Sequence, residues 1–305
     1  MRVAVLGPGG VGGLVAGALD RAGGADVIVV AREETAAVIS AQGLRVNSVS
    51  LGEFITHPRA VERLQEPVDA LLVATKASGL KPALERVIAA PALVLPLLNG
   101  LDHIALLRER FEPASVLAGS IRVEADRPEP GVVVHTSPFL LVSMASREPA
   151  VRPAMQALAE TLSDAGVPAK VLDSEEQVMW SKLVRLNALA CTTSAYDKLL
   201  GEIRSTPELR ADLVAAIEEG CAVGVAEGAA DVDPATAIAE LELAHDTLGS
   251  SMQRDIAAGR TPELDAIPGS VLRAAARHGL ECPTIERLVA IIAGRAGIAQ
   301  PLLAR

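Results

Sequence analysis

Aromatic side chains are scarce in this chain of 305 residues, which has three Phe, one Tyr and one Trp. Positive charge is also in short supply, because 28 Lys and Arg stand against 38 Asp and Glu and leave a formal net charge of −10. Nucleic-acid binders need a basic surface for phosphates, and single-strand binders need aromatic rings on which bases stack. We therefore expect no nucleic-acid partner. Half of the residues are apolar, which provides for a substantial core and excludes a disordered chain.

Cysteine and histidine are few and scattered. Cys191, Cys221 and Cys282 form an odd, widely spaced set, which excludes a disulfide framework and a CxxC metal knuckle. We expect reduced thiols packed as small apolar groups, as in a cytoplasmic protein. The five His residues lack ligand spacing, so we expect no metal, and His135 in VVVHT is interpreted as a strand residue.

Long apolar runs are missing as well. The start of the chain, MRVAVLGPGGVGGLVAGAL, superficially resembles a signal peptide, but Gly-Pro-Gly-Gly interrupts it and it carries a single Arg. The longest other run, Val87–Leu98, contains two prolines and falls short of the roughly 20 residues that span a bilayer. We therefore expect a soluble protein with no membrane partner.

The first half of the chain alternates two patterns. Short apolar runs predict strands at 2–7, 26–31, 69–75, 93–98, 116–119, 132–136 and 139–143, and helical patterns follow at 11–22, 33–41 and 80–90. Apolar strands that alternate with helices indicate a mostly parallel sheet covered on both faces.

The second half is helical almost throughout, with patterns at 174–199, 207–228, 234–248, 267–278 and 283–295. The fold class we predict is α/β: an N-terminal Rossmann-type, mostly parallel sheet followed by an all-helical C-terminal domain. The predicted domains are 1–170, which binds the cofactor, and 171–305, which binds substrate and carries the catalysis. The cleft between two such domains is the default place for an active site.

A glycine-rich turn follows the first predicted strand and opens the first predicted helix, in the sequence Gly7-Pro8-Gly9-Gly10-Val11-Gly12. This GxGxxG pattern is weak alone, but its place between strand and helix is the one that dinucleotide binding requires. Gly7 permits the tight turn, Gly9 lets the backbone approach a pyrophosphate, and Gly12 lets helix and strand pack closely. The N–H groups of the helix start then face the phosphates. The alternative is an ordinary glycine-rich turn.

The end of the second predicted strand discriminates between nicotinamide cofactors. An acidic residue there binds the ribose 2′-OH of NAD, whereas a nearby Arg accommodates the 2′-phosphate of NADP. Here Ala31 is neutral and Arg32 follows, which favours NADP. Two alternatives stay open: Glu33 or Glu34 reaches the ribose, or Arg32 is simply solvated.

Several motifs together resemble the ketopantoate reductase (2-dehydropantoate 2-reductase) family over nearly the whole chain. After the glycine turn and Arg32 come ATKAS, LNGLD, PGVVVHT, MWSKLVRLN, SSMQRDIAAGRTPELDAIPG and HGLECP, in that order. The resemblance implies NADPH-dependent reduction of 2-dehydropantoate to pantoate in pantothenate biosynthesis, with a small 2-oxo acid as substrate. It is compatible with a homodimer.

The resemblance also implies roles for single residues. Lys182 matches the proton donor, Glu263 an acidic residue near cofactor and substrate, and Ser251 the residue that binds the substrate carboxylate. Along the cofactor it places the six residues from Gly7 to Gly12 together with Arg32, Lys76, Ala125 and Asn99, which also reaches substrate. Taken alone, Lys182 fits a solvated surface, Glu263 a surface acid, Ser251 a helix N-cap and Asn99 a turn.

The chain departs from the family where substrate is held. The family usually has Asn four and eight residues after the catalytic Lys, where this chain has Leu186 and Ala190. Asn187 comes one residue late, and a one-residue helical bulge would bring it to the first of these positions, as a substrate-binding residue, with Cys191 at the second. A further family Asn is replaced by Leu200. Two alternatives therefore stay open: the same hydride chemistry on another 2-oxo acid, or a non-catalytic NADP-binding sensor.

Overall fold

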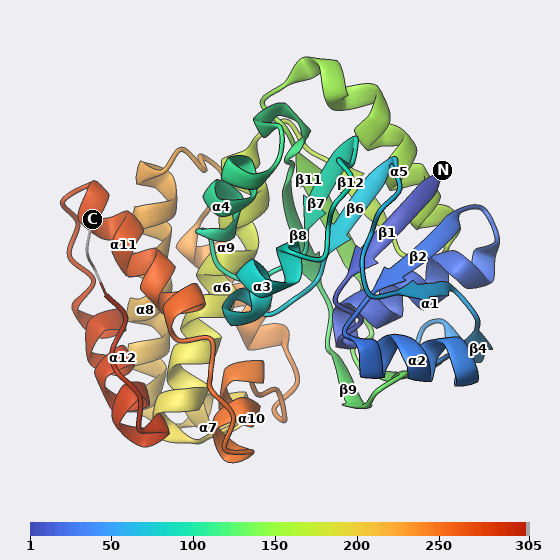
Figure 1. Cartoon of the computed structure of the whole chain (residues 1–305). Coiled ribbons are helices and arrows are strands. Elements are labelled where there is room, and N and C mark those ends of the chain that lie inside the picture. Colours follow the sequence, from blue (N-terminus) through green and yellow to red (C-terminus); the bar gives the residue numbers. More distant parts are fainter. Residues whose placement is uncertain (303–305) are drawn as a thin grey trace. The chain divides into compact units, whose positions relative to one another are not determined.

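The structure, a computed structural model, describes residues 1–302, which divide into two compact units (Figure 1). Unit 1 comprises Met1–Leu98 and His103–Val178. Unit 2 comprises Asn99–Asp102 and, of the described residues, 179–302. The predicted fold class is confirmed, because a parallel sheet with covering helices forms unit 1 and helices form unit 2.

A five-stranded parallel sheet is the centre of unit 1. Its order is β5-β2-β1-β6-β7, made of β1 (Arg2–Leu6), β2 (Asp26–Val30), β5 (Arg59–Val61), β6 (Ala70–Val73) and β7 (Leu93–Pro96). Successive residues of β1 enter different cores: Val3 and Val5 join one cluster, Ala4 and Leu6 the other. Both faces are therefore buried, which explains why the strands are apolar apart from the charged first residues of β1, β2 and β5.

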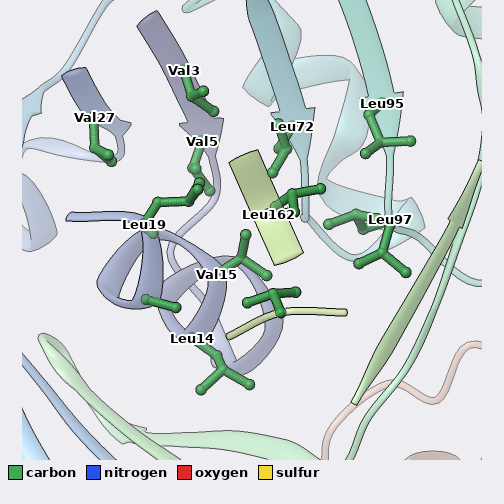
Figure 2. Close-up of a cluster of buried hydrophobic side chains, with 14 of the residues drawn as sticks. Val3, Val5, Leu14, Val15, Leu19, Val27, Leu72, Leu95, Leu97 and Leu162 are labelled. Carbon is green, nitrogen blue, oxygen red and sulfur yellow. The ribbon is translucent and has the colours of Figure 1, made fainter. Parts of the chain in front are cut away.

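Helices cover both faces of this sheet. On one face, Leu14, Val15 and Leu19 of α1 (Gly10–Ala22) and Leu162 of α5 (Arg152–Asp164) belong to the same buried cluster as the odd-numbered residues of β1 (Figure 2). On the other face lie buried residues of α3 (Leu80–Leu84) and α4 (His103–Arg110). Helix α2 (Glu33–Gln42) follows β2. This packing fixes the carboxyl ends of the strands, where the predicted cofactor residues lie.

The helix predicted at 80–90 is too long. It ends at Leu84, because the following residues pair with another strand-like segment: Leu64 donates its N–H to the carbonyl of Arg86, and Ile88 donates to the carbonyl of Leu64. Val87 is fully buried by this pairing. Tertiary contact has here overridden a helical pattern.

Two smaller sheets complete unit 1, and sequence reasoning found only part of them. One has the order β4-β3-β10-β9 and the other β12-β11-β8. Their strands are β3 (Leu44–Ser48), β4 (Gly52–Thr56), β8 (Ala118–Arg122), β9 (Ala125–Glu129), β10 (Val132–His135), β11 (Leu141–Ala145) and β12 (Ala169–Val171). Predicted strands correspond to β8, β10 and β11, and His135 does end a strand.

Unit 2 consists of helices, as predicted. They are α6 (Glu175–Tyr196, which begins in unit 1), α7 (Leu200–Ser205), α8 (Pro207–Ala226), α9 (Pro234–Leu243), α10 (Ser251–Ala257), the π-helical turn η4 (Asp265–Gly269), α11 (Ser270–Arg277) and α12 (Pro283–Ala296). Proline opens α8, α9 and α12, where its missing N–H has no helical partner to lose. Within residues 1–302, no helix is both long and apolar enough to cross a membrane.

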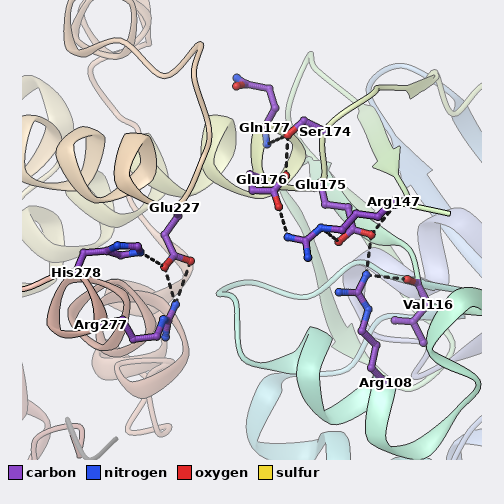
Figure 3. Close-up of polar contacts among 10 residues, drawn as sticks. All are labelled: Arg108, Val116, Arg147, Ser174, Glu175, Glu176, Gln177, Glu227, Arg277 and His278. Atoms are coloured by element: carbon purple, nitrogen blue, oxygen red, sulfur yellow. Dashed lines mark hydrogen bonds and ion pairs between the residues drawn. The ribbon is translucent and has the colours of Figure 1, made fainter.

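The start of α6 is fixed by polar contacts within unit 1 (Figure 3). The Ser174 hydroxyl accepts the N–H of Gln177 at 3.0 Å, which is an N-cap. The buried Glu175 carboxylate accepts from Arg108 at 2.7 Å and from the backbone N–H of Arg147 at 3.1 Å. These contacts set where the helix that carries the predicted proton donor begins.

The three cysteines are free thiols buried in unit 2, as expected. Burial raises the pKa of Cys221 to about 11 and that of Cys282 to about 12, and it also raises the pKa of Cys191. Thiols with raised pKa values are poor nucleophiles, which fits a packing role.

Candidate functional site

Three predicted site residues lie together in unit 2, although they are far apart in the sequence. Lys182 Nζ donates a hydrogen bond to Asn99 Oδ1 at 2.9 Å. Asn99 Nδ2 donates in turn to Glu263 Oε2 at 3.1 Å. All three residues are half-buried. An ammonium, an amide and a carboxylate are thus joined in a row, with the amide accepting at one end and donating at the other.

The elements that carry Lys182 and Glu263 are held by their surroundings. Lys182 lies near the start of α6, and the neighbouring Trp180, Leu183 and Val184 are all buried. Glu263 lies just before η4, and its carbonyl accepts the N–H of Ile267 at 3.0 Å. Both side chains therefore project from segments whose backbone is fixed.

Asn99 is placed by the glycine that follows it. Gly100 has a φ of +85°, and a Cβ built there would lie 1.9 Å from the carbonyl oxygen of Ala266 in η4. Any side chain at this position would push the Asn99 segment away from η4. The Asn-Gly pair therefore serves a close backbone contact that brings Asn99 to Glu263.

The glycine turn forms the carboxyl end of β1 and the start of α1 in unit 1. Gly7 has a φ of +90° and Gly12 packs so closely that a Cβ would lie 2.2 Å from the carbonyl oxygen of Gly7. Gly9 is different, because a Cβ there would meet nothing within 4 Å and its φ of −77° is ordinary. The protein's own packing does not require glycine at position 9, so the open space above it suits a bound group such as a pyrophosphate.

The first turn of α1 is suited to an anion. Its N-cap residue, Gly9, provides no side-chain cap, and the first turn has no acidic residue. The N–H groups of that turn have no partner within the helix, and the helix dipole adds a partial positive charge. The residues present therefore fit the phosphates of a dinucleotide.

Ala125 contacts the same turn. A Cβ on Gly10 would lie 2.3 Å from the Ala125 carbonyl oxygen, so only glycine allows the start of β9 to approach the start of α1. The structure thus brings two of the predicted cofactor residues together within unit 1.

Arg32 and Lys76 are both exposed and follow strands of the parallel sheet. Arg32 comes two residues after β2 as the N-cap of α2, and Lys76 comes three residues after β6. Both positions are at the carboxyl ends of strands, where open α/β sheets bind ligands. Glu33 and Glu34 occupy the first turn of α2 and are exposed as well.

Helix α6 lacks the bulge that would bring Asn187 to the helix face of Lys182. Helix α6 is regular from Glu175 to Tyr196, so Asn187 lies about 140° around the helix from Lys182. The side chain of Asn187 is fully buried; its Oδ1 accepts from Cys191 Sγ at 3.5 Å, and its Nδ2 has no partner among the described residues. The structure therefore does not bring Asn187 to the helix face of Lys182.

Ser251 is the first residue of α10 and is exposed. The N-cap is its neighbour Ser250, whose hydroxyl accepts the N–H of Gln253 at 3.1 Å and is buried against Thr193. The N-cap role that the sequence allowed for Ser251 thus belongs to Ser250. Two adjacent serines, both good caps, gave no signal to choose between them.

The family's asparagine positions are apolar here, and the structure shows where they lie. Ala190 and Leu200 are fully buried in unit 2. Leu186 is half-buried on α6, one turn after Lys182 and on the same face. That face of α6 therefore presents an apolar side chain beside the ammonium.

The chain is similar to known proteins over most of its length. Residues 3–143 match the family described as ketopantoate reductase PanE/ApbA, and residues 175–296 match the C-terminal region of that family. A 2-dehydropantoate 2-reductase of Mycobacterium tuberculosis (strain ATCC 25618 / H37Rv) is 30% identical over 302 residues, covering 95% of this chain and 96% of that protein.

Solved structures are similar over the same length. A 2-dehydropantoate 2-reductase from Geobacter metallireducens GS-15 has a TM-score of 0.88 and 25% identity, covering 96% of this chain and 99% of that one. A D-mandelate dehydrogenase, solved with NADH and anilino(oxo)acetate, has a TM-score of 0.88 and 22% identity, covering 97% and 99%. The second likeness is one of fold.

Proposed function

Since the chain belongs to the ketopantoate reductase (PanE/ApbA) family and is an oxidoreductase of that family, we propose that it reduces 2-dehydropantoate to pantoate with NADPH, a step of pantothenate biosynthesis. The observation that carries the proposal is the row of hydrogen bonds from Lys182 through Asn99 to Glu263. A purely structural or sensing protein has no need of an ammonium positioned in this way.

The cofactor would be held by the glycine turn. The space at Gly9 and the N–H groups of the first turn of α1 suit the pyrophosphate, and the exposed Arg32 at the end of β2 suits a 2′-phosphate. Lys76 follows β6 at another strand end and would bind along the cofactor. The reduced nicotinamide supplies a hydride to the carbonyl carbon of the substrate.

Lys182 provides the proton in this proposal. As the hydride arrives, negative charge develops on the carbonyl oxygen, and the ammonium both stabilises that charge and donates the proton. Asn99 Oδ1 accepts one N–H of Lys182 and so fixes the direction of the ammonium. Glu263 accepts the Asn99 amide N–H, which keeps the oxygen of that amide turned toward Lys182. The two neighbours thus orient the proton donor before substrate arrives.

Ser251 stays the predicted carboxylate residue. It is exposed in the first turn of α10, where its hydroxyl and nearby N–H groups can donate to an anion. Ser250 would support it as the buried N-cap of the same helix. Ser251 therefore belongs to the substrate-binding part of the proposal.

A second candidate keeps the reaction and changes the substrate. Leu186, one turn after Lys182, places hydrocarbon where the family usually has a polar amide, and Ala190 and Leu200 are buried. An apolar side chain at that position favours a substrate side chain without a hydroxyl group, because an unpaired hydroxyl against hydrocarbon costs about 1–3 kcal/mol. The similar fold of a D-mandelate dehydrogenase is compatible with this candidate.

The test is a panel of 2-oxo acids with NADPH and with NADH, followed by the loss of absorbance of the reduced cofactor. The panel contains 2-dehydropantoate, its analogue 3-methyl-2-oxobutanoate, which lacks the hydroxymethyl group, and phenylglyoxylate. The proposal expects the highest kcat/KM with 2-dehydropantoate and NADPH. Preference for an analogue without the hydroxyl supports the second candidate, and cofactor binding without turnover of any member supports a sensor.

A further inference from the structure

The guanidinium group of Arg273, in α11, joins the segments of Asp102 and Asp265 in unit 2. One of its nitrogens, Nη2, donates to Asp102 Oδ2 at 2.6 Å and to the carbonyl oxygen of Asp265 at 2.8 Å. The other, Nη1, donates to Asp265 Oδ1 at 2.8 Å and to the carbonyl oxygen of Leu302 at 3.1 Å. Only 17% of the Arg273 side chain is exposed, although Asp102 and Asp265 face solvent more fully.

The two bridged segments carry two residues of the candidate site. Asp102 comes three residues after Asn99, and Asp265 comes two residues after Glu263. The close contact of Gly100 with Ala266 joins the same two segments. Arg273 therefore lies where it fixes the distance between the Asn99 segment and η4, and the Asn99–Glu263 hydrogen bond of 3.1 Å depends on that distance.

We propose that Arg273 is a positioning residue of the active site: through Asp102 and Asp265 it keeps Asn99 between Glu263 and Lys182, and so orients the proton donor. This inference rests on the proposed function. Arg273 itself acts only through Asn99 and Glu263.

Arginine suits this position for a geometric reason. Its planar group has several donors in a fixed fork, so that a single side chain holds two carboxylates and two carbonyls at once. Burial of its side chain disfavours its charge, but its pKa is nevertheless raised, because both carboxylates bind the charged form. The bridge is therefore charged, and its Asp102 end lies in Asn99–Asp102, the short segment that belongs to unit 2 although the chain on either side of it belongs to unit 1.

The same helix offers a matched control. Arg277 lies one turn after Arg273 in α11 and binds both carboxylate oxygens of Glu227, at 3.0 and 3.1 Å, and Glu227 is not a candidate site residue (Figure 3). Arg277→Gln removes an arginine–carboxylate pair without touching the Asn99 segment. Any general effect of losing such a pair from α11 should appear in this variant too.

The first measurement compares kcat and the KM of each reactant in Arg273→Gln and Arg277→Gln, with the best substrate of the panel. Misplacing a catalytic group by about 1 Å costs up to about 100-fold in rate. We expect kcat to fall about 10- to 100-fold in Arg273→Gln, whereas kcat and both KM values stay at wild-type values in Arg277→Gln. Equal kinetics in the two variants would overturn the proposal.

A double-mutant cycle separates positioning from mere stabilisation. If Arg273 acts through Asn99, Arg273→Gln has little further effect on kcat once Asn99 is replaced by Ala. If Arg273 only stabilises the fold, the fold-losses in kcat of the two single variants multiply in the double variant, and the proposal fails. Should Arg273→Gln not fold, Asp102→Asn replaces it in the cycle, because that change weakens the bridge at the Asn99 side and leaves the Asp265 contacts.

The bridge can also be tested without any turnover. Hydrogen exchange of the peptide that covers Asn99–Asp102 should become faster in Arg273→Gln and stay unchanged in Arg277→Gln. If the wild-type enzyme reduces no 2-oxo acid, the proposed function fails and the catalytic part of this inference fails with it. If the wild type is active but exchange of that peptide is the same in both variants, the positioning inference fails alone.

Discussion

Replacement by Ala should have different effects at Gly12 and at Gly9. At Gly12 it should lower the stability of the fold, and at Gly9 it should lower the affinity for NADPH. Gly12→Ala places a methyl group 2.2 Å from the backbone oxygen of Gly7, and a backbone atom cannot move aside without shifting β1 or α1. Overpacking of this kind costs about 3 kcal/mol. In a unit of this size we expect the midpoint of thermal unfolding to fall by about 6–12 °C.

Gly9→Ala should leave the fold almost intact. Its φ of −77° suits alanine, and the added methyl group meets no atom within 4 Å. The loss of a favourable N-cap residue and the smaller entropy of the unfolded chain are opposite effects of similar size, each below about 1 kcal/mol. The melting temperature should therefore stay within about 3 °C of the wild type.

Affinity for NADPH should fall in Gly9→Ala, the variant whose stability is almost unchanged. The methyl group of Gly9→Ala occupies the space proposed for the pyrophosphate. If this steric overlap costs about 1.4–2.8 kcal/mol of binding free energy, NADPH binds about 10- to 100-fold more weakly. The assays are thermal unfolding without cofactor and titration of NADPH by its fluorescence. Wild-type NADPH affinity in a folded Gly9→Ala protein, or wild-type stability of Gly12→Ala, would refute the reasoning.

Two further predictions concern charge. Arg32→Ala should weaken NADPH about 10- to 100-fold and leave NADH nearly unchanged, because a charged hydrogen bond to the 2′-phosphate is lost; an unaltered ratio of the two dissociation constants would discredit this role. Burial lowers the pKa of His135, which accepts or donates hydrogen bonds with Ser48 and Ser137. Stability from the neutral ring is complete above the unfolded pKa of about 6.5 and is lost as pH falls below it. Between pH 7.5 and 5.5, the free energy of unfolding measured with urea should fall less for His135→Gln than for the wild type. An identical fall in the two proteins would contradict this role of His135.

The sequence predicted those parts of the fold that depend on local patterns. After their charged first residues, β1 and β2 are apolar at every position because both faces of the central sheet are buried, so their patterns predicted strands. Strand β4 was missed because most of it is exposed and only its last residue is buried. The end of α3 depends on the pairing of Leu64 with Val87, which no local pattern reveals.

The candidate site was partly predictable for a similar reason. Motifs identified Lys182, Asn99 and Glu263 one by one, but their hydrogen bonds join residues 83 and 164 positions apart. No sequence signal predicted the bridge made by Arg273. Arg273 and Arg277 are four residues apart in a helix, and such a pair is typical of a solvated helix face. The regular course of α6, which buries Asn187, is likewise set by packing in unit 2.

The central claim is that the ammonium of Lys182 delivers the proton during reduction of a 2-oxo acid. The most direct test is kcat of Lys182→Ala, with and without small primary amines in solution, beside its dissociation constant for NADPH. Loss of a positioned general acid predicts a kcat lower by about 10²- to 10⁴-fold, partial recovery with added amine, and unchanged cofactor affinity. A variant that turns over substrate at the wild-type rate would contradict the account.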